Sequence, residues 1–360
     1  MSLNTGFHRL KIAEVRKETT DAVSVRFEIP EELKEKFRFR AGQHLTLRAD
    51  IGGEDVRRTY SVCCAPHENE IRIAIKKMPG GRFSSWANEA LQPGNSIDVL
   101  APMGRFVIPE RDQASPYYVA MAGGSGITPV LSIAKTALGE IDGSRFTLLY
   151  GNRDTPSIMF LEELAALKNR YLDRLEVYHF LENEAEEIEL FNGRLDREKC
   201  DEVLAHLVDT KAVNAFFICG PGPMMDAAEG ALKARGVPDE NIFIERFTSS
   251  ALSGDRLAAV EVLQQKAAGT DMTVTLDGRR SIVRFDVSKG NILDSVQAAG
   301  LPAPYACKGG VCTTCRAKIL SGTVTMKQNY GLTPQEVEQG YVLTCQAVPT
   351  SDGVQLSYDN

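Results

Sequence analysis

The sequence predicts a multidomain protein in which an antiparallel β-barrel is followed by an α/β domain with a parallel sheet and then by a small α+β domain. Three observations predict this order. Short strands with a period of two and frequent turn residues occupy residues 1–108. From about residue 115, apolar strands alternate with helical segments. Near the carboxyl end, a hairpin and two short helices flank a loop that contains three cysteines.

The barrel is predicted over residues 1–110. Apolar and polar residues alternate at 23–27 and again at 71–75, as in half-buried strands. Turn pairs such as Pro93-Gly94 separate the strands, and only residues 82–91 have a helical pattern. Short, evenly spaced strands of this kind favour an antiparallel barrel.

The α/β domain is predicted over residues 111–247. Its candidate strands are apolar runs at 117–121, 146–150, 175–180 and 215–219. Helical patterns follow or separate them, at residues 127–138, 157–170, 196–208 and 224–235. This alternation favours a parallel sheet that is covered by helices on both faces.

The last domain is predicted over residues 271–360, after a small and polar linker at 248–270. Asp277-Gly278 between two apolar runs is a strong hairpin signal. Asn291 precedes a short helical pattern, and Thr333-Pro334-Gln335-Glu336 predicts a capped helix start. The result is a compact α+β domain around the cysteine loop.

The cysteine loop has the spacing C-x₄-C-x₂-C at Cys307, Cys312 and Cys315, and Cys345 follows further on. This is the plant-type spacing of four thiolates that hold a [2Fe–2S] cluster. A disulfide pair or a structural zinc site is the alternative, but zinc sites usually combine two C-x₂₋₄-C pairs, and here the fourth cysteine stands alone. The other cysteines outside this motif include Cys63, Cys64 and Cys200, which are expected to be small buried side chains.

A phosphate-binding turn is predicted at Gly124-Ser125-Gly126, between a strand and a helix. Pro129 departs from the G-x-G-x-x-G pattern, so an ordinary tight turn is the alternative. Cys219-Gly220-Pro221 ends another strand at the edge where such sheets bind ligands, and an ordinary turn into the next helix is the alternative. Arg153 and Asp154 follow the second strand; an arginine there suits the 2′-phosphate of NADPH and a carboxylate suits the ribose of NADH.

The barrel carries two further candidate binding segments. Arg58-Thr59-Tyr60-Ser61 combines a cation, an aromatic ring and hydroxyl groups on one strand. Gly81-Arg82-Phe83-Ser84 opens the only predicted helix of this domain. Arginines can pair with phosphates, while a tyrosine offers a flat face to a ring system. Ordinary surface arginines on a barrel strand are the alternative.

Composition narrows the class of protein. Hydrophobic residues make up 43% and charged residues 25%, as in ordinary globular proteins. The net charge of −7 argues against a nucleic-acid binder. No apolar run approaches the roughly 18 residues that span a bilayer, and the first residues lack the apolar core of a secretory signal. A reducing cytoplasm is the expected compartment, because a cluster needs free thiolates.

These motifs together, with Glu245-Arg246-Phe247 after them, resemble the ferredoxin–NADP reductase superfamily fused to a ferredoxin, the reductases that feed bacterial oxygenases. The resemblance covers essentially the whole chain and implies a β-grasp fold for the last domain. It implies that Arg58, Thr59, Tyr60, Ser61, Gly81, Arg82, Phe83 and Ser84 hold FAD, with Phe247 near the flavin. It implies that Gly124, Ser125, Gly126, Ile127, Thr128, Arg153, Cys219, Gly220 and Pro221 hold the nicotinamide dinucleotide, and that Cys307, Cys312, Cys315 and Cys345 hold the cluster.

The implied activity is a relay from NADPH, with NADH possible, to FAD, to the cluster and then to an oxygenase. No side-chain acid or base is required for hydride transfer, and none is nominated. Segments 39–45, 150–153 and 305–312 are most similar to the reductase components of phenylacetyl-CoA epoxidases, which implies a di-iron epoxidase as partner in phenylacetate catabolism. Lys308, Arg316 and Lys318 are a hypothetical cationic docking rim for it.

Three alternatives remain from sequence. The same relay could serve a ring-hydroxylating dioxygenase or a phenol hydroxylase, which only the choice of oxygenase partner would distinguish. A cluster-bearing redox sensor without turnover would not need two complete organic cofactor sites. A zinc-stabilised adaptor would contain no iron.

Overall fold

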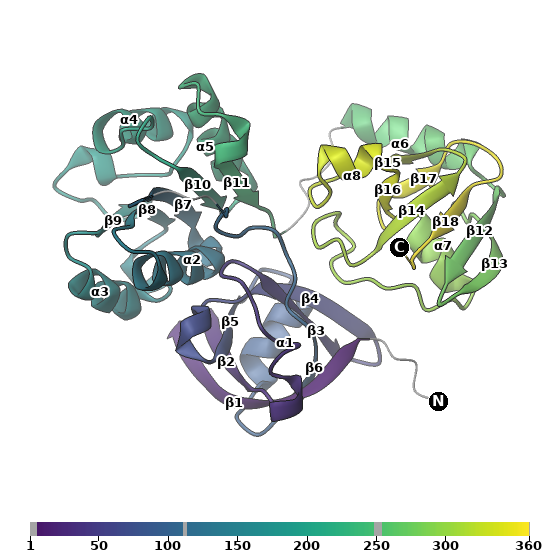
Figure 1. Cartoon of the computed structure of the whole chain (residues 1–360), viewed down its shortest axis with the longest axis horizontal. Coiled ribbons are helices and arrows are strands. Elements are labelled where there is room, and N and C mark those ends of the chain that lie inside the picture. Colours follow the sequence, from purple (N-terminus) through teal and green to yellow (C-terminus); the bar gives the residue numbers. More distant parts are fainter. Residues whose placement is uncertain (1–5, 111–113, 248–253, 360) are drawn as a thin grey trace. The chain divides into compact units, whose positions relative to one another are not determined.

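The computed structural model describes residues 6–110, 114–247 and 254–359. The chain divides into two compact units, Met1–Glu245 and Arg246–Asn360, each described below by itself (Figure 1). The first unit contains an antiparallel and a parallel sheet, and the second contains a smaller mixed sheet. Among the described residues, none of the helices has the length and hydrophobicity that crossing a bilayer requires.

The first unit begins with a six-stranded antiparallel sheet in the order β4-β3-β6-β1-β2-β5. Its strands are β1 (Phe7–Thr19), β2 (Ala22–Glu28), β3 (His44–Asp50), β4 (Asp55–Ser61), β5 (Ile71–Lys76) and β6 (Ser96–Leu100). A bridge between Val62 and Ile73 joins the end of β4 to β5, so the two edges of the sheet meet. The predicted antiparallel barrel is therefore confirmed.

Helix α1 (Arg82–Ala90) is the helix predicted in the barrel domain. It turns Phe83 and Ala87 into the barrel core, against residues such as Leu47 and Ile73. Two short 3₁₀ turns, Glu31–Leu33 and Pro66–Glu68, were not expected from the sequence. A single turn of this kind is too short to show a hydrophobic period.

The parallel sheet has the order β11-β10-β7-β8-β9 (Figure 1). Its strands are β7 (Tyr117–Gly123), β8 (Arg145–Asn152), β9 (Leu175–Leu181), β10 (Ala215–Cys219) and β11 (Ile242–Glu245). The helices are α2 (Ile127–Glu140), α3 (Leu161–Arg170), α4 (Arg197–Leu207) and α5 (Gly222–Ala234). In Figure 1, α4 and α5 lie on one face of this sheet and α2 and α3 on the other, as predicted.

One predicted helix starts later than expected. Residues 157–170 were expected to be helical, but α3 begins only at Leu161. Thr155–Ser157 form a 3₁₀ turn capped by Asp154, and Phe160 has a left-handed backbone with φ of 61°. This conformation interrupts the hydrogen-bond ladder, so the helix cannot extend further toward its amino end.

The second unit contains the sheet β13-β12-β18-β14-β16 and a separate pair, β15-β17. Its strands are β12 (Asp271–Leu276), β13 (Arg279–Arg284), β14 (Arg316–Ser321), β15 (Val324–Met326), β16 (Tyr341–Leu343), β17 (Ala347–Pro349) and β18 (Gln355–Ser357). The hairpin at Asp277-Gly278 is confirmed, and both residues have positive φ, 52° and 71°. Positive φ at both positions is what a tight hairpin of this type requires.

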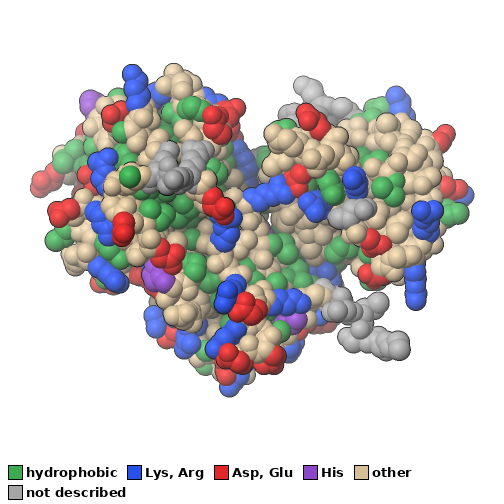
Figure 2. All heavy atoms as spheres, in the orientation of Figure 1, with side chains coloured by type: hydrophobic (Ala, Val, Ile, Leu, Met, Phe, Trp, Pro, Cys, Tyr) green, Lys and Arg blue, Asp and Glu red, His purple; other side chains and the backbone are tan. Residues whose placement is uncertain are grey.

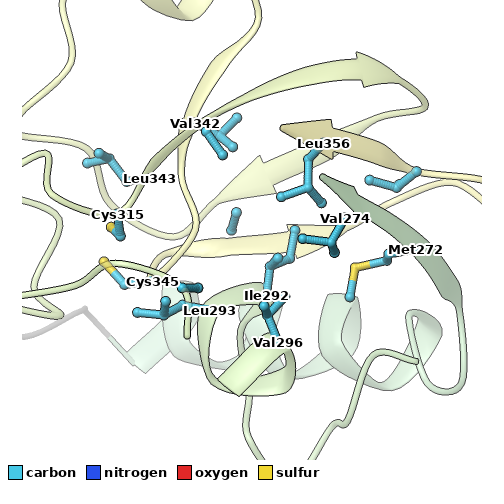
Figure 3. Packing of buried hydrophobic residues seen from close by; sticks show 14 of the residues in the cluster. Met272, Val274, Ile292, Leu293, Val296, Cys315, Val342, Leu343, Cys345 and Leu356 are labelled. Carbon is cyan, nitrogen blue, oxygen red and sulfur yellow. The ribbon is translucent and has the colours of Figure 1, made fainter. Parts of the chain in front are cut away.

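Two helices of this unit begin at the predicted caps. The side chain of Asn291 accepts a hydrogen bond from the Asp294 amide at the start of α7 (Ile292–Ala298). Thr333 and Glu336 form the predicted capping box of α8 (Pro334–Glu338). Helix α7 packs Ile292, Leu293 and Val296 into the core drawn in Figure 3.

The predicted linker differs from the structure over much of its length. Residues 254–266 form helix α6 (Gly254–Lys266), while 248–253 lie outside the described residues. Leu263 packs against the core of the second unit, and Ala267 is part of it. Small and polar residues suggested a linker because they show little amphipathic pattern; a few apolar contacts at the carboxyl end are enough to dock the helix.

Lys135 on α2 joins the barrel to the parallel-sheet domain. Its Nζ lies 2.9 and 3.0 Å from the carboxylate oxygens of Glu68 and also contacts Glu163, and its side chain is only 9% exposed.

The substitution Lys135→Met should lower the free energy of unfolding of the first unit by about 1–3 kcal/mol, because two carboxylates lose their buried partner. Denaturant unfolding checks this. Lys233→Met, which breaks solvent-accessible ion pairs with Glu229 and Asp239, is the control and should cost less than about 1 kcal/mol; equal costs would contradict the prediction.

Candidate functional site

The carboxyl ends of β7 and β10 lie side by side in the parallel sheet. Strand order reverses between them, because β8 and β9 continue on one side and β11 on the other. Dinucleotides bind at such switch points in open α/β sheets. The two predicted turns, 123–126 after β7 and 220–221 after β10, therefore meet where a ligand is expected.

Glycine is required where these turns touch. A Cβ at Gly126 would lie 1.9 Å from the carbonyl oxygen of Cys219, and one at Gly220 would lie 2.7 Å from Met224 Cε. Gly124 has a positive φ of 51°. Glycines in such a turn let the backbone approach a pyrophosphate at the amino end of the following helix.

The other predicted residues near these two turns are mostly buried and stabilise them. Ser125 is half-buried, and its carbonyl accepts a hydrogen bond from Thr128 Oγ1 at 3.0 Å. Ile127 and Thr128 are buried, so their side chains stabilise the turn rather than face solvent. Pro221 caps α5. Cys219 is fully buried, and burial, followed by the Glu245 charge, raises the pKa of its thiol. The Cys219 thiol is therefore uncharged.

Lys76 is a candidate site residue that the sequence analysis missed. It ends barrel strand β5, and its Nζ would lie 3.9 Å from a Cβ at Gly124. Its side chain is 16% exposed, and burial lowers the pKa of the ammonium. A cation beside a phosphate-binding turn suits a pyrophosphate. The only signal for Lys76 in the sequence was its position at the end of a strand with alternating apolar residues.

Arg153 lies at the end of β8, where the sequence predicted a nucleotide-selecting residue. Its side chain is 59% exposed, and its Nη2 lies 3.4 Å from Asp21 Oδ2 of the β1–β2 turn. Asp154 is engaged differently: its Oδ1 accepts a hydrogen bond from the Ser157 amide at 3.0 Å. Of the two adjacent charges, the arginine is thus the accessible one.

On β4, Arg58, Thr59, Tyr60 and Ser61 follow the alternation of a strand paired with β3. Arg58 is exposed, and the Tyr60 ring packs on Phe83 at a centroid distance of 5.7 Å. Ser61 is buried, and its Oγ has no hydrogen-bond partner within the described chain. A buried hydroxyl without a partner is costly unless a bound group supplies one, which fits the edge of a flavin ring.

His44 is a second residue that the sequence analysis missed. It pairs in register with Ser61 and is 5% exposed, and its Nε2 has no partner within the described residues. Its Nδ1 lies 3.7 Å from Glu245 Oε1. Burial lowers the pKa of His44 to about 4, so the ring is neutral near pH 7.

The start of α1 provides the second predicted phosphate site. Gly81 precedes the helix, and a Cβ there would lie 2.4 Å from Ser84 Oγ. Ser84 Oγ accepts a hydrogen bond from the Met78 amide at 3.1 Å and thereby fixes the turn. Arg82 is exposed and contacts Glu54. Phe83 is buried beneath Tyr60, so it supports the barrel surface from inside.

The four predicted cluster ligands form two pairs. Hydrogen bonding links Cys307 to Cys312 and Cys315 to Cys345. Figure 3 shows the sulfur atoms of Cys315 and Cys345 facing one another at the edge of the core. The hydrogen bond with the Cys312 thiol lowers the pKa of Cys307; burial opposes this shift, and backbone amides add to it. Two pairs match two irons with two thiolates each.

A single zinc ion would need one tight group of ligands instead. No group of three or more His, Cys, Asp or Glu side chains in the described part of the chain is arranged to hold one metal ion. Cys63, Cys64 and Cys200 are buried free thiols, as expected. Phe247 lies at the start of the second unit, and its expected place near the flavin stays a prediction.

Gly126→Ala tests the contact between the two turns. The added methyl group cannot fit against the Cys219 carbonyl, so we expect a loss of about 1–3 kcal/mol of unfolding free energy and much weaker dinucleotide binding. Thermal unfolding and equilibrium binding of the dinucleotide measure both effects. Gly230→Ala on α5, where the methyl group meets only the flexible Arg197 side chain, is the control. Unchanged binding in Gly126→Ala would contradict the assignment of this turn.

Three family models match the chain in order. They are the oxidoreductase FAD-binding domain at residues 9–108, the oxidoreductase NAD-binding domain at 121–230 and the 2Fe-2S iron-sulfur cluster binding domain at 274–350. The chain is 43% identical to one of the subunits of 1,2-phenylacetyl-CoA epoxidase from Escherichia coli K12, over 99% of this chain and 98% of the relative.

A second relative is the ferredoxin reductase component of 3-ketosteroid-9-alpha-monooxygenase from Mycobacterium tuberculosis, 38% identical over 97% of this chain and 95% of the relative. Among solved structures, phthalate dioxygenase reductase aligns with a TM-score of 0.59 at 24% identity, over 98% of both chains, which shows the shared fold. The chain belongs to the ferredoxin–NADP reductase superfamily, in the group whose FAD- and NAD-binding domains are fused to a [2Fe–2S] ferredoxin domain and which forms the reductase component of multicomponent oxygenases.

Proposed function

We propose that this reductase takes electrons from NADPH and passes them through FAD and a [2Fe–2S] cluster to a separate oxygenase. The observation that carries the proposal is the pairing of the four thiols, in a chain that also has two sites suited to dinucleotides. When bound, a flavin can accept a hydride and release single electrons, which a nicotinamide and a cluster cannot exchange directly.

Each predicted residue has a proposed task in this relay. Cys307, Cys312, Cys315 and Cys345 would hold the cluster. Arg58, Tyr60 and Ser61 would hold FAD, with the Ser61 hydroxyl gaining the partner it lacks. The start of α1 would take the FAD pyrophosphate, and the 124–128 turn with Lys76 would take that of the nicotinamide dinucleotide. The buried Cys219 and His44 would supply neutral groups beside the Glu245 carboxylate and would exclude water.

The preference for NADPH rests on the end of β8. Arg153 is accessible there, whereas Asp154 is occupied as a cap. A carboxylate that is hydrogen-bonded to its own chain is poorly placed to bind a ribose 2′-hydroxyl, and an exposed guanidinium suits a 2′-phosphate.

The proposed acceptor is a phenylacetyl-CoA epoxidase, which the resemblance implies is a di-iron oxygenase. The 43% identity to one component of such an enzyme supports this choice. The 38% identity to a ketosteroid monooxygenase component keeps another oxygenase as the alternative. Reconstitution with each purified oxygenase distinguishes them, since only the true partner should turn over its substrate at the expense of NADPH.

Two residues of the cationic docking rim expected from sequence have acidic partners. Lys308 Nζ lies 2.6 Å from Asp294, and Arg316 Nη1 lies 2.9 Å from Glu336, so both charges are paired. Lys318 and Arg316 both lie over the Tyr341 ring. Acidic and basic side chains are likewise interspersed over the face of the second unit in Figure 2. We therefore propose a mixed aromatic and charged surface as the docking face.

Cys312→Ser tests the cluster and its place in the relay. We expect the visible absorbance of the cluster to be lost and the flavin spectrum to remain, because the ligands and the flavin site lie in different units. Reduction of a small dye by NADPH should continue, and reduction of the oxygenase should stop. Cys200→Ser, at a buried cysteine of α4, is the control. Oxygenase reduction by the Cys312→Ser protein would contradict the relay.

Arg153→Ala tests the choice of nucleotide. We expect KM for NADPH to rise about tenfold, because a charge-assisted contact is lost, while KM for NADH changes less than about twofold. Steady-state dye reduction with each nucleotide measures the ratio. Arg170→Ala on α3 removes an exposed arginine away from the strand end and should leave both values unchanged. Equal effects on both nucleotides would exclude a 2′-phosphate contact.

A further inference from the structure

Gln346 directly follows the fourth cysteine and sits between β16 and β17. Its backbone is held on both sides: its amide donates to the Leu343 carbonyl at 2.8 Å, and its carbonyl accepts from the Lys327 amide at 2.9 Å. The carboxamide is half-buried and turns toward the cysteine loop. The two backbone hydrogen bonds therefore fix the position from which the Gln346 side chain extends.

The Gln346 side chain connects two ligand-bearing segments. Its Nε2 donates to the Lys308 carbonyl at 2.8 Å and lies 3.7 Å from Cys345 Sγ, within reach of an N–H···S hydrogen bond. Gly310 leaves room for it, since a Cβ there would lie 3.0 Å from Gln346 Cγ. The glutamine side chain thus links the loop that begins at Cys307 to the segment that contains Cys345.

The other sulfurs receive hydrogen bonds mainly from backbone amides. Cys307 Sγ accepts from the Gly309 and Cys312 amides at 3.3 and 3.4 Å, and Cys312 Sγ accepts from the Cys307 amide at 3.4 Å. Substitution of a side chain cannot remove these donors. The Thr314 side chain is also hydrogen-bonded to Cys312. At Cys345 the side-chain donor is the Gln346 carboxamide, so its contribution can be measured.

Hydrogen bonds to the sulfurs stabilise the more negative, reduced cluster and raise its reduction potential. We propose that Gln346 is a positioning residue that sets this potential and holds the Cys307 loop over the Cys345 ligand. The proposal rests on the ligand set given under Proposed function. It concerns how readily the cluster accepts an electron from the flavin, a property that the ligand spacing does not determine.

Two variants of the full-length holoenzyme test the proposal. Gln346→Leu removes the donor, and Gln346→Glu keeps the shape but replaces the amide with a carboxylate. Dye-equilibrated titration of cluster absorbance should show that the ratio of reduced to oxidised cluster at a fixed potential falls threefold to tenfold in Gln346→Leu and further in Gln346→Glu. A tenfold fall corresponds to 59 mV for one electron. Gln297→Leu, which removes an amide that donates to the Ala303 carbonyl, is the matched control and should not shift the potential.

The outcomes separate a potential-setting role from a packing role. Faster cluster loss in Gln346→Leu with an unchanged potential would overturn the proposal. A shift of the same size in Gln297→Leu would also overturn it. If Gln346→Leu fails to assemble a cluster, the potential of Gln346→Glu decides, and an unchanged value there counts against the proposal. A separate variant, Cys345→Ser, tests the ligand set itself. If Cys345 is not a ligand, this variant should retain a normal cluster spectrum, so failure of the ligand set can be told apart from failure of the Gln346 proposal.

Discussion

The juxtaposition of Cys315 and Cys345 is the constraint on which the second unit depends. Cys315 directly precedes β14 and Cys345 follows β16, and these strands pair through Arg316 and Leu343. The amide and hydroxyl of Thr344 both donate to the Cys315 carbonyl, at 3.1 and 2.9 Å, and Tyr358 donates to Thr344 Oγ1 at 3.0 Å. Because both sulfurs also belong to the hydrophobic core, unfolding the sheet would separate one ligand pair. With Cys315 and Cys345 as the proposed ligands, we expect folding and cluster binding to be coupled.

A comparable constraint organises the first unit. The turns after β7 and β10 touch backbone to backbone at Gly126 and Cys219, and no larger residue fits between them. Near this contact, burial keeps the Cys219 thiol and the His44 ring uncharged, and the Glu245 carboxylate lies beside both. We propose that the cations Lys76, at the Gly124 turn, and Arg153, after β8, face the phosphates of a bound dinucleotide. In the proposed site, buried groups that exclude water and cations beside the phosphates would suit hydride transfer, which needs orientation but no proton donor.

Local chemistry explains how much could be predicted from the sequence. The Asp277-Gly278 hairpin and the Thr333 capping box are each determined by neighbouring residues, and both are found where expected. Features that depend on distant contacts were missed. Helix α6 lacks a strong apolar face, and Lys76 meets the Gly124 turn only because the barrel packs against the parallel-sheet domain. Pairing of Lys308 and Arg316 with carboxylates from other elements likewise could not be inferred from their positions along the chain.

Anaerobic stopped-flow spectroscopy of the holoenzyme mixed with NADPH tests the central claim, that the flavin stands between the nucleotide and the cluster. The account predicts that flavin absorbance falls first and that cluster absorbance falls in a later phase. In protein depleted of FAD, the cluster should stay oxidised under the same conditions. Cluster reduction that precedes flavin reduction, or that proceeds without FAD, would contradict the relay.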